Sequence, residues 1–491
     1  AIQFIDEQPD EPFYMQVWFY HMHTPVVSDQ AGRDAYADVT FDRDAFDAPM
    51  REYLEGVDNF DDRMIEYCGA LTAMDAAIGR LLNHLDTLGI ADDTLILFTS
   101  DNGPEDAALV FEAGNRGVGN SARFRGRKRS LYEGGIRVPA IARWTGVVPA
   151  GQRDDQSVLT TSDWLPTVAS ILGVESPPGI DGEDRSKVFC GIPTRRERSA
   201  FWEYRSSTFG DDAYDAPQFA MRQGDWKVLF EPDGSRPIEL YDLEADPEEQ
   251  VNLAEQKPEL TARLVEELQT HAGALEASAP AIVDQPASQL TLVQGERRSL
   301  SVEAAGMPIP NFRWLRDGVA ITDDERIVGS STPVLTFLTP AEQDEAVYRC
   351  EVENVHGSSA TTDIDVHFDP PPPERTRKNI VLVIADDLNT KIRCYGDTQA
   401  ITPNIDRLAA RGVQFQRAYC NHALCGPSRA SFLSGLHSWT TGIGSTGQRV
   451  RSVIPDHLHL AEHLRAQGYH TSAVGKVDHD TDLIPWDHVD R

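Results

Sequence analysis

The residues from Cys425 to Gly435 carry the clearest chemical signal in the chain and read Cys-Gly-Pro-Ser-Arg-Ala-Ser-Phe-Leu-Ser-Gly. Pro427 favours the first turn of a helix, and Ser428 can accept hydrogen bonds from free backbone N–H groups there. A thiol at a helix N-terminus beside a guanidinium lies in a field that favours anions, so Arg429 and the helix predict a lowered pKa for the Cys425 thiol. The plainer alternative is a small buried cysteine at the start of a helix.

Two apolar runs predict buried strands of a parallel sheet, residues 94–99 and residues 379–385. The first run leads to Asp101 and Asn102, and the second leads to Asp386 and Asp387. Carboxylate and amide oxygens at such strand ends suit a hard divalent cation, and two adjacent carboxylates repel unless a cation compensates them. Taken alone, Asp-Asn-Gly is more often a turn, and one of the paired aspartates could cap the next helix.

A third run, residues 12–20, is rich in aromatic and β-branched residues and predicts another buried strand that leads to His21 and His23. Histidines just beyond a strand end lie where α/β sheets bind ligands, although two histidines of a surface loop would look the same. Basic side chains gather at residues 125–128 in an otherwise acidic chain. Such cations bind oxyanions, and a solvated basic loop is the alternative.

The Cys425 motif, the residues after these strands and the segment 402–408 resemble the signatures of the type I, formylglycine-dependent sulfatases. In that family a maturation enzyme oxidises the cysteine to formylglycine, whose hydrate attacks the sulfur of a sulfate ester. The resemblance implies that Cys425 is the precursor of the nucleophile and that Arg429 stabilises it. Ser434 stands where the family usually has threonine, a change that keeps the hydroxyl group.

The resemblance also implies a metal site and a sulfate-binding set. The implied metal is calcium, with magnesium as the alternative, and its implied ligands are Asp386, Asp387, Asp101, Asn102 and the modified Cys425. Four further residues are implied for sulfate contacts and proton transfer: Lys128, Lys476, His23 and His479. The lysines would offset charge that grows on the sulfate oxygens, one histidine would protonate the leaving alcohol, and the other would help to release sulfate. The Lys-x-x-His spacing resembles the iduronate-sulfatase-like branch of the family.

Composition shifts along the chain of 491 residues divide it into three portions. Residues 1–275 resemble the later part of a sulfatase, residues 376–491 resemble its N-terminal part, and residues 280–368 resemble an immunoglobulin-like β-sandwich. We therefore predict an α/β fold of the alkaline-phosphatase-like type, with a mostly parallel sheet and helices on both faces, and a separate β-sandwich.

The sandwich is recognised by Trp314 and by Tyr348, which stands two residues before Cys350 as in a tyrosine corner. Val302 stands where the partner cysteine would align, so we expect a buried thiol at Cys350 and no disulfide. A spacer is its simplest role, because no residue specifies a ligand. Residues 369–373, Asp-Pro-Pro-Pro-Pro, predict a stiff linker.

The two sulfatase-like portions occur in inverted order, which leaves three interpretations. The chain is a circular permutant with Ala1 near Arg491, or two incomplete sulfatases joined by the sandwich, or a non-catalytic remnant. We favour joined fragments, because the segment between the Lys476 element and the His23 strand is shorter than in the family and the portions resemble different subfamilies. Each portion would expose a sheet edge, so the two could still dock as one domain.

The balance of 45 basic and 78 acidic residues gives a formal net charge of -33, and no basic stripe is present to bind nucleic acid. No run is long and apolar enough to predict a membrane span. The six cysteines lack dense or C-x-x-C spacing and leave the redox compartment undecided. The chain begins at Ala1 without a start methionine or signal peptide, and the resemblance implies a periplasmic or extracellular location.

The most specific hypothesis is a sulfuric ester hydrolase that acts on a sulfated carbohydrate or an aryl sulfate. Such an enzyme would need a formylglycine-generating maturation enzyme as a partner. A phosphatase or phosphodiesterase of the same superfamily is one alternative. The other is an inactive binding protein made of two partial sulfatases.

Overall fold

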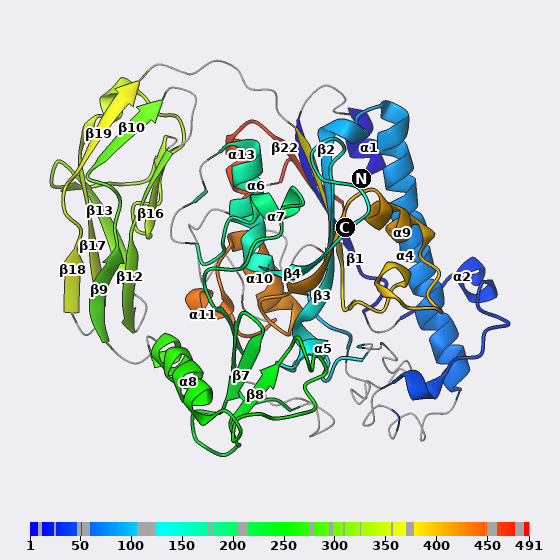
Figure 1. Cartoon of the computed structure of the whole chain (residues 1–491). Coiled ribbons are helices and arrows are strands. Elements are labelled where there is room, and N and C mark those ends of the chain that lie inside the picture. Colours follow the sequence, from blue (N-terminus) through cyan, green and yellow to red (C-terminus); the bar gives the residue numbers. More distant parts are fainter. Residues whose placement is uncertain are drawn as a thin grey trace.

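The fold is that of a computed structural model of the whole chain, shown in Figure 1. The structure describes residues 1–7, 12–23, 26–46, 51, 59–105, 119, 121, 123–174, 176–177, 180–204, 215–273, 278–293, 298–307, 310–324, 326–354, 357–369, 378–446, 448, 459–476 and 486–490. Within these ranges, no helix combines the length and the apolar character needed to cross a membrane.

A mixed sheet of eight strands forms the centre of the α/β part, in the order β23-β22-β1-β20-β2-β3-β21-β4. Its strands are β1 (Phe13–Phe19), β2 (Thr94–Ser100), β3 (Arg137–Arg143), β4 (Gln152–Thr160), β20 (Asn379–Ala385), β21 (Val413–Tyr419), β22 (His470–Gly475) and β23 (His488–Asp490). β3 runs antiparallel to its neighbours β2 and β21, and the other paired strands of this sheet are parallel. The prediction of a mostly parallel sheet is confirmed.

Strands from the two portions of the chain are interleaved in this sheet. Val381 of β20 pairs with Met15 of β1 on one side and with Ile96 of β2 on the other. Close to the termini, the rings of Phe4 and His488 lie 5.7 Å apart between their centroids. The two portions thus complete one sheet, in which each supplies strands that cover edges of the other. A circular permutant predicts this arrangement, and the joined-fragments interpretation allowed it as docking of the two portions.

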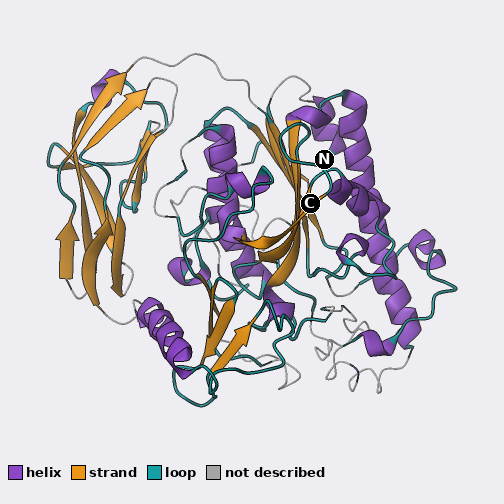
Figure 2. Ribbon diagram, viewed as in Figure 1, coloured by secondary structure: helices purple, strands orange, loops and turns teal. Residues whose placement is uncertain are grey.

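Both faces of the sheet are buried, because side chains alternate between two cores along each strand. Along β2, Leu95 and Leu97 belong to one core, whereas Ile96 and Phe98 belong to the other. Helices cover both faces, as Figure 2 shows. On one face lie α4 (Phe60–Leu88) and α9 (Pro403–Ala410), and on the other lie α6 (Trp164–Leu172), α10 (Cys425–Ser434) and α13 (Leu460–Ala466).

Shorter helices complete this part of the chain. The α-helices are α1 (Ile2–Glu7), α2 (Gln30–Asp34), α5 (Glu133–Ile136), α7 (Ser186–Phe189) and α11 (Ser438–Thr441). The single 3-10 turns of this part are η1 (Arg43–Ala45), η2 (Ala91–Asp93), η3 (Thr161–Asp163) and η6 (Arg393–Tyr395), and a further turn, η5 (Glu342–Asp344), belongs to the β-sandwich.

A small antiparallel sheet packs against the α/β part through a buried charge cluster. Its strands are β5 (Ala200–Glu203), β6 (Phe219–Gln223), β7 (Trp226–Phe230) and β8 (Glu239–Asp242), and the apolar face of α8 (Pro258–Gly273) covers it. Nζ of Lys227 on β7 lies 3.1 Å from Oε1 of Glu133 and 2.8 Å from Oε1 of Glu249. All three side chains are fully buried, so their charges require one another.

The β-sandwich stands apart from the large sheet in Figure 1. Its strands are β9 (Ser278–Asp284), β10 (Gln289–Val293), β11 (Arg298–Ser301), β12 (Glu303–Met307), β13 (Asn311–Arg316), β14 (Val319–Ala320), β15 (Ile327–Val328), β16 (Val334–Phe337), β17 (Ala346–Asn354), β18 (Gly357–Ala360) and β19 (Ile364–Asp369). Trp314 pairs with Cys350 in its core, and Oη of Tyr348 donates to the backbone O of Asp344 at 3.0 Å, a tyrosine corner. Cys350 is buried and free, which confirms the expected thiol.

The predicted architecture, an α/β fold with helices on both faces and an immunoglobulin-like sandwich, is confirmed. The boundaries at residues 1–275, 280–368 and 376–491 stay predictions. Residues 370–373 of the predicted linker lie outside the described residues.

Asp75 on α4 caps α9, a helix that is more than 300 residues away in sequence. Its Oδ1 accepts from the N–H groups of Asn404 at 3.0 Å and Ile405 at 2.7 Å, and the residue is 1% exposed. We expect Asp75→Ala to lower the free energy of unfolding by about 1–3 kcal/mol, because two helix-start donors lose their acceptor. Urea unfolding measures this change, with the exposed Arg80→Ala on the same helix as the control. A loss no larger than that of the control would contradict the assignment.

Candidate active site

The strands β22, β1, β20 and β2 are parallel neighbours, and polar side chains follow the end of each. These side chains are Lys476 after β22, His23 beyond β1, Asp386 and Asp387 after β20, and Asp101 and Asn102 after β2. Because parallel strands end at the same edge of a sheet, side chains from both ends of the chain meet there. This edge of the sheet is the candidate active site.

Three aspartates share a small volume at this edge. Asp101, Asp386 and Asp387 each offer a carboxylate oxygen, and these oxygens lie within 4.8 Å of one another. All three residues are buried, and the N–H of Asp387 donates to Oδ1 of Asp101 at 3.1 Å. Asp387 has a φ of 56°, a left-handed conformation that costs a non-glycine residue about 1–3 kcal/mol. The residues packed around Asp387 therefore stabilise a strained backbone conformation and keep its carboxylate close to two others that repel it.

Arg429 of α10 bridges two of these aspartates. Its Nε and Nη2 donate to Oδ2 of Asp101 at 2.9 and 2.8 Å, and Nη2 lies 2.8 Å from Oδ2 of Asp386. The guanidinium also lies over the ring of Trp18, 4.6 Å from its centroid. The structure thus places this arginine, predicted as a neighbour of the nucleophile, where it neutralises carboxylates.

Two lysines supply further positive charge. Nζ of Lys128 donates to Oδ1 of Asp387 at 2.6 Å, and Nζ of Lys476 donates to Oδ2 of Asp386 at 3.2 Å. Nδ2 of Asn102 also donates to Oδ1 of Asp387, at 2.7 Å. Each carboxylate therefore has one oxygen that accepts from a cation.

The pKa values of the aspartates diverge. Burial opposes ionisation of Asp386, but Arg429, Lys128 and Lys476 together hold its pKa well below the ordinary value. Burial and the neighbouring carboxylates raise the pKa of Asp101 and of Asp387. Ionisation of Asp101 and Asp387 is therefore disfavoured by burial and by the neighbouring carboxylates, whereas the cations keep Asp386 ionised.

Three buried oxygens at this edge have no hydrogen-bond partner among the described residues: Oδ1 of Asn102, Oδ1 of Asp386 and Oδ2 of Asp387. Leaving such atoms unpaired is costly. Carboxylate and amide oxygens are the ligands that calcium and magnesium prefer. The residues present therefore fit a divalent cation held by Asp101, Asn102, Asp386 and Asp387.

Cys425 begins α10 and is 2% exposed. Burial raises the pKa of its thiol, and Lys128 and Arg429 lower it by less. The predicted lowered pKa is therefore wrong, because desolvation outweighs the attraction of the nearby cations. Ser428 also differs from its prediction: its Oγ donates to the backbone O of Asp101 at 2.5 Å and does not cap α10.

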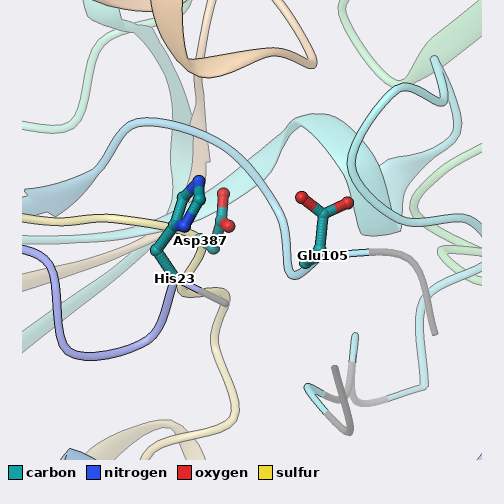
Figure 3. A group of neighbouring side chains, drawn as sticks. All are labelled: His23, Glu105 and Asp387. Atoms are coloured by element: carbon teal, nitrogen blue, oxygen red, sulfur yellow. The ribbon is translucent and has the colours of Figure 1, made fainter. Parts of the chain in front are cut away.

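His23 lies at the same edge, and Figure 3 shows its ring next to Asp387, with Glu105 nearby. One ligand atom from each of these three residues lies within 4.8 Å of the others. The ring of His23 stacks on Tyr20 at 4.5 Å between centroids, and Nζ of Lys476 lies 4.5 Å from the centroid of the Tyr20 ring. The structure thus brings His23 and Lys476 to the aspartates.

The structure places three further residues at the site, for which the sequence predicts no role there: Trp18, Tyr20 and Glu105. Trp18 and Tyr20 were recognisable only as residues of a predicted strand. The pattern of a strand does not reveal which aromatic ring will pack against a cation. Glu105 follows the Asp-Asn-Gly-Pro motif directly, and this adjacency was the one available signal. The predicted His479 lies outside the described residues.

Comparison with protein families bears directly on this geometry. The family model described as "Sulfatase" matches residues 1–174 and 378–482, together more than half of the chain. The chain belongs to the sulfatase family. Two further models match this sulfatase-family chain: "N-sulphoglucosamine sulphohydrolase, C-terminal" at residues 124–274 and "Immunoglobulin domain" at residues 279–354.

Several sulfatases are similar to this sulfatase-family chain over part of its length. Steryl-sulfatase of Homo sapiens is 34% identical over 42% of this chain and 30% of the relative. Arylsulfatase A of Homo sapiens is 30% identical over 50% of this chain and 45% of the relative. The N-acetylgalactosamine-6-O-sulfatase of Bacteroides thetaiotaomicron is 31% identical over 40% of each chain. The matches therefore span less than half of the length of each relative.

Calcium should stabilise the folded chain, because it would neutralise the crowded carboxylates. At a free concentration 100 times the dissociation constant, binding adds about 2.7 kcal/mol to the free energy of unfolding. Thermal unfolding in calcium and in EDTA measures this as a difference in Tm. Asp387→Asn should lose most of the difference, whereas Asp225→Asn, which alters a partly exposed ion pair with Arg417, should keep it. An equal Tm in calcium and EDTA would contradict the metal site.

The buried ring of His422 should lower the free energy of unfolding in mild acid. The residue is 3% exposed, and burial lowers the pKa of its ring from 6.5 to about 3. The unfolded chain takes up this proton near pH 6.5 and the folded chain does not, so the stabilisation is complete above pH 6.5 and is lost as the pH falls towards 3.

A single such group changes the free energy of unfolding by about 1.4 kcal/mol per pH unit. Between pH 7 and pH 5 we therefore expect His422→Gln to lose roughly 2 kcal/mol less of this free energy than the wild type does. Urea unfolding at the two pH values measures the loss for the variant and the wild type. The same loss in both proteins would mean that this ring does not stay neutral in the fold.

Proposed function

We propose that this chain hydrolyses sulfate esters with a formylglycine made from Cys425. The observation that carries the proposal is the cluster of Asp101, Asp386 and Asp387, which α10, the helix that Cys425 begins, contacts through Ser428 and Arg429. A cation site next to a nucleophile precursor and two lysines suits an ester whose oxygens carry negative charge. Membership of the sulfatase family supports the same reaction.

In this proposal Asp101, Asn102, Asp386 and Asp387 hold calcium, with magnesium as the alternative, and the modified side chain at position 425 is a further ligand. The ion supplies positive charge for a sulfate oxygen. The hydrated aldehyde at position 425 supplies the oxygen that attacks sulfur.

The other residues act on charge and protons. Lys128 and Lys476 contact the remaining sulfate oxygens and offset the charge that grows on them. Arg429 holds Asp101 and Asp386 in place through its ion pairs. Of His23 and His479, one protonates the leaving alcohol and the other assists the release of sulfate.

The proposed substrate class is a sulfated carbohydrate or an aryl sulfate. Among the relatives, one is named an arylsulfatase and another an N-acetylgalactosamine sulfatase, which supports this choice. A formylglycine-generating maturation enzyme is then a required partner. We place the mature protein in the periplasm or outside the cell.

Coexpression with a formylglycine-generating enzyme tests the proposal. We expect mass spectrometry of the tryptic peptide that contains Cys425 to show conversion of the thiol to an aldehyde. We expect the same protein to cleave an aryl sulfate in a calcium-dependent reaction. Cys425→Ala should abolish turnover. Cys190→Ser changes a free cysteine that is not part of the candidate site, so this variant should retain turnover.

The alternatives give different results. A phosphatase or phosphodiesterase would cleave phosphate esters faster than sulfate esters with an unmodified Cys425. A binding protein with an inactive site would cleave neither. An unmodified thiol together with no metal-dependent turnover would refute the proposed function.

A further inference from the structure

Glu105 is a buried carboxylate at the candidate site to which none of the roles above applies. It is 6% exposed and follows Pro104. Three consecutive basic residues converge on it. Nη1 of Arg127 donates to the backbone O of Glu105 at 3.2 Å. Nζ of Lys128 lies 3.4 Å from Oε2 of Glu105, and Arg129 forms an ion pair with Oε1.

Backbone hydrogen bonds also fix the basic segment, residues 127–129. The N–H of Lys128 donates to the backbone O of Pro104 at 3.0 Å, and the N–H of Arg129 donates to the backbone O of Ala423 at 2.6 Å. Arg129 has a φ of 73°, a left-handed conformation that is unfavourable for a residue with a side chain. Its ion pair with Glu105 helps to hold that conformation, and with it the direction of Lys128.

A metal ligand is the alternative role for Glu105, because Glu105, His23 and Asp387 in Figure 3 are close enough to share a metal ion. A cation already lies between the two carboxylates: Nζ of Lys128 is 2.6 Å from Oδ1 of Asp387 and 3.4 Å from Oε2 of Glu105. The lysine side chain is 1% exposed, so water does little to screen it. A divalent ion in the same place would be strongly repelled.

We propose that Glu105 is a positioning residue that holds the ammonium of Lys128 towards the substrate sulfate while Asp387 binds the cation. The inference rests on the proposed function. Asp387 attracts Lys128 through Oδ1, and this attraction weakens once the carboxylate shares its charge with a divalent ion. Among the described residues, Glu105 is then the other carboxylate within 4 Å of this ammonium.

A double-mutant cycle on the calcium-loaded, formylglycine-containing protein tests this role. Glu105→Ala should lower kcat/KM for an aryl sulfate by about 10- to 100-fold. It should weaken the binding of inorganic sulfate, measured by calorimetry, by a similar factor. In a Lys128→Ala background, the same change should cost less than about 2-fold in both measurements, because the effect of Glu105 acts through the lysine.

Glu183→Gln is the matched control, since its carboxylate lies 3.4 Å from Arg185 and 3.7 Å from Arg196 and is also mostly buried. It should leave kcat/KM and sulfate binding unchanged. Glu105→Gln keeps the size of the side chain and removes its charge, so it should behave like Glu105→Ala and replaces it if the alanine variant does not fold.

Equal effects of the Glu105 change with and without Lys128 would overturn the inference. So would a count of two calcium ions per chain that falls to one in the Glu105 variant, because Glu105 would then be a metal ligand. A wild-type protein that cleaves no sulfate ester would defeat the proposed function instead. The sulfate-binding comparison would still decide the role of Glu105: weakening supports it, and unchanged binding overturns it.

Discussion

The carboxylates of Asp101, Asp386 and Asp387 repel one another at separations below 4.8 Å, and burial leaves little water to screen them. Such a cluster is tolerated only where cations offset it. Here the cations come from three different elements: Arg429 on α10, Lys476 at the end of β22 and Lys128 in the loop before α5. Folding and site formation are therefore coupled, because every element that supplies a charge must also be packed in place.

The strand order meets this requirement despite the inverted order of the two portions. β20 lies between β1 and β2, so the paired aspartates reach the aspartate and amide that follow β2. Strand neighbours are chosen by burial of both faces and by pairing of both edges, and neither depends on which portion comes first in the chain. The immunoglobulin-like sandwich interrupts the sequence without entering this sheet (Figure 1).

Some of this could be predicted from the sequence, for identifiable reasons. Residues 95–98 and 380–385 are apolar throughout, as suits strands that are covered on both faces, so the strands and the polar residues at their ends were recognisable. The thiol pKa of Cys425 could not be predicted from its helix and neighbours, because its sign depends on how many other elements bury it. The sequence signal of Glu105 was its adjacency to the Asp-Asn-Gly-Pro motif, and its role could not be predicted from that, since its contacts depend on how residues 127–129 fold back onto it.

The proposed activity requires that oxygens from both ends of the chain bind a single cation beside position 425. Anomalous X-ray scattering from calcium-containing crystals can locate that cation. We expect one anomalous peak within about 2.3–2.6 Å of oxygens from Asp101, Asn102, Asp386 and Asp387. A peak coordinated by residues of only one portion, or no peak at this edge of the sheet, would contradict it.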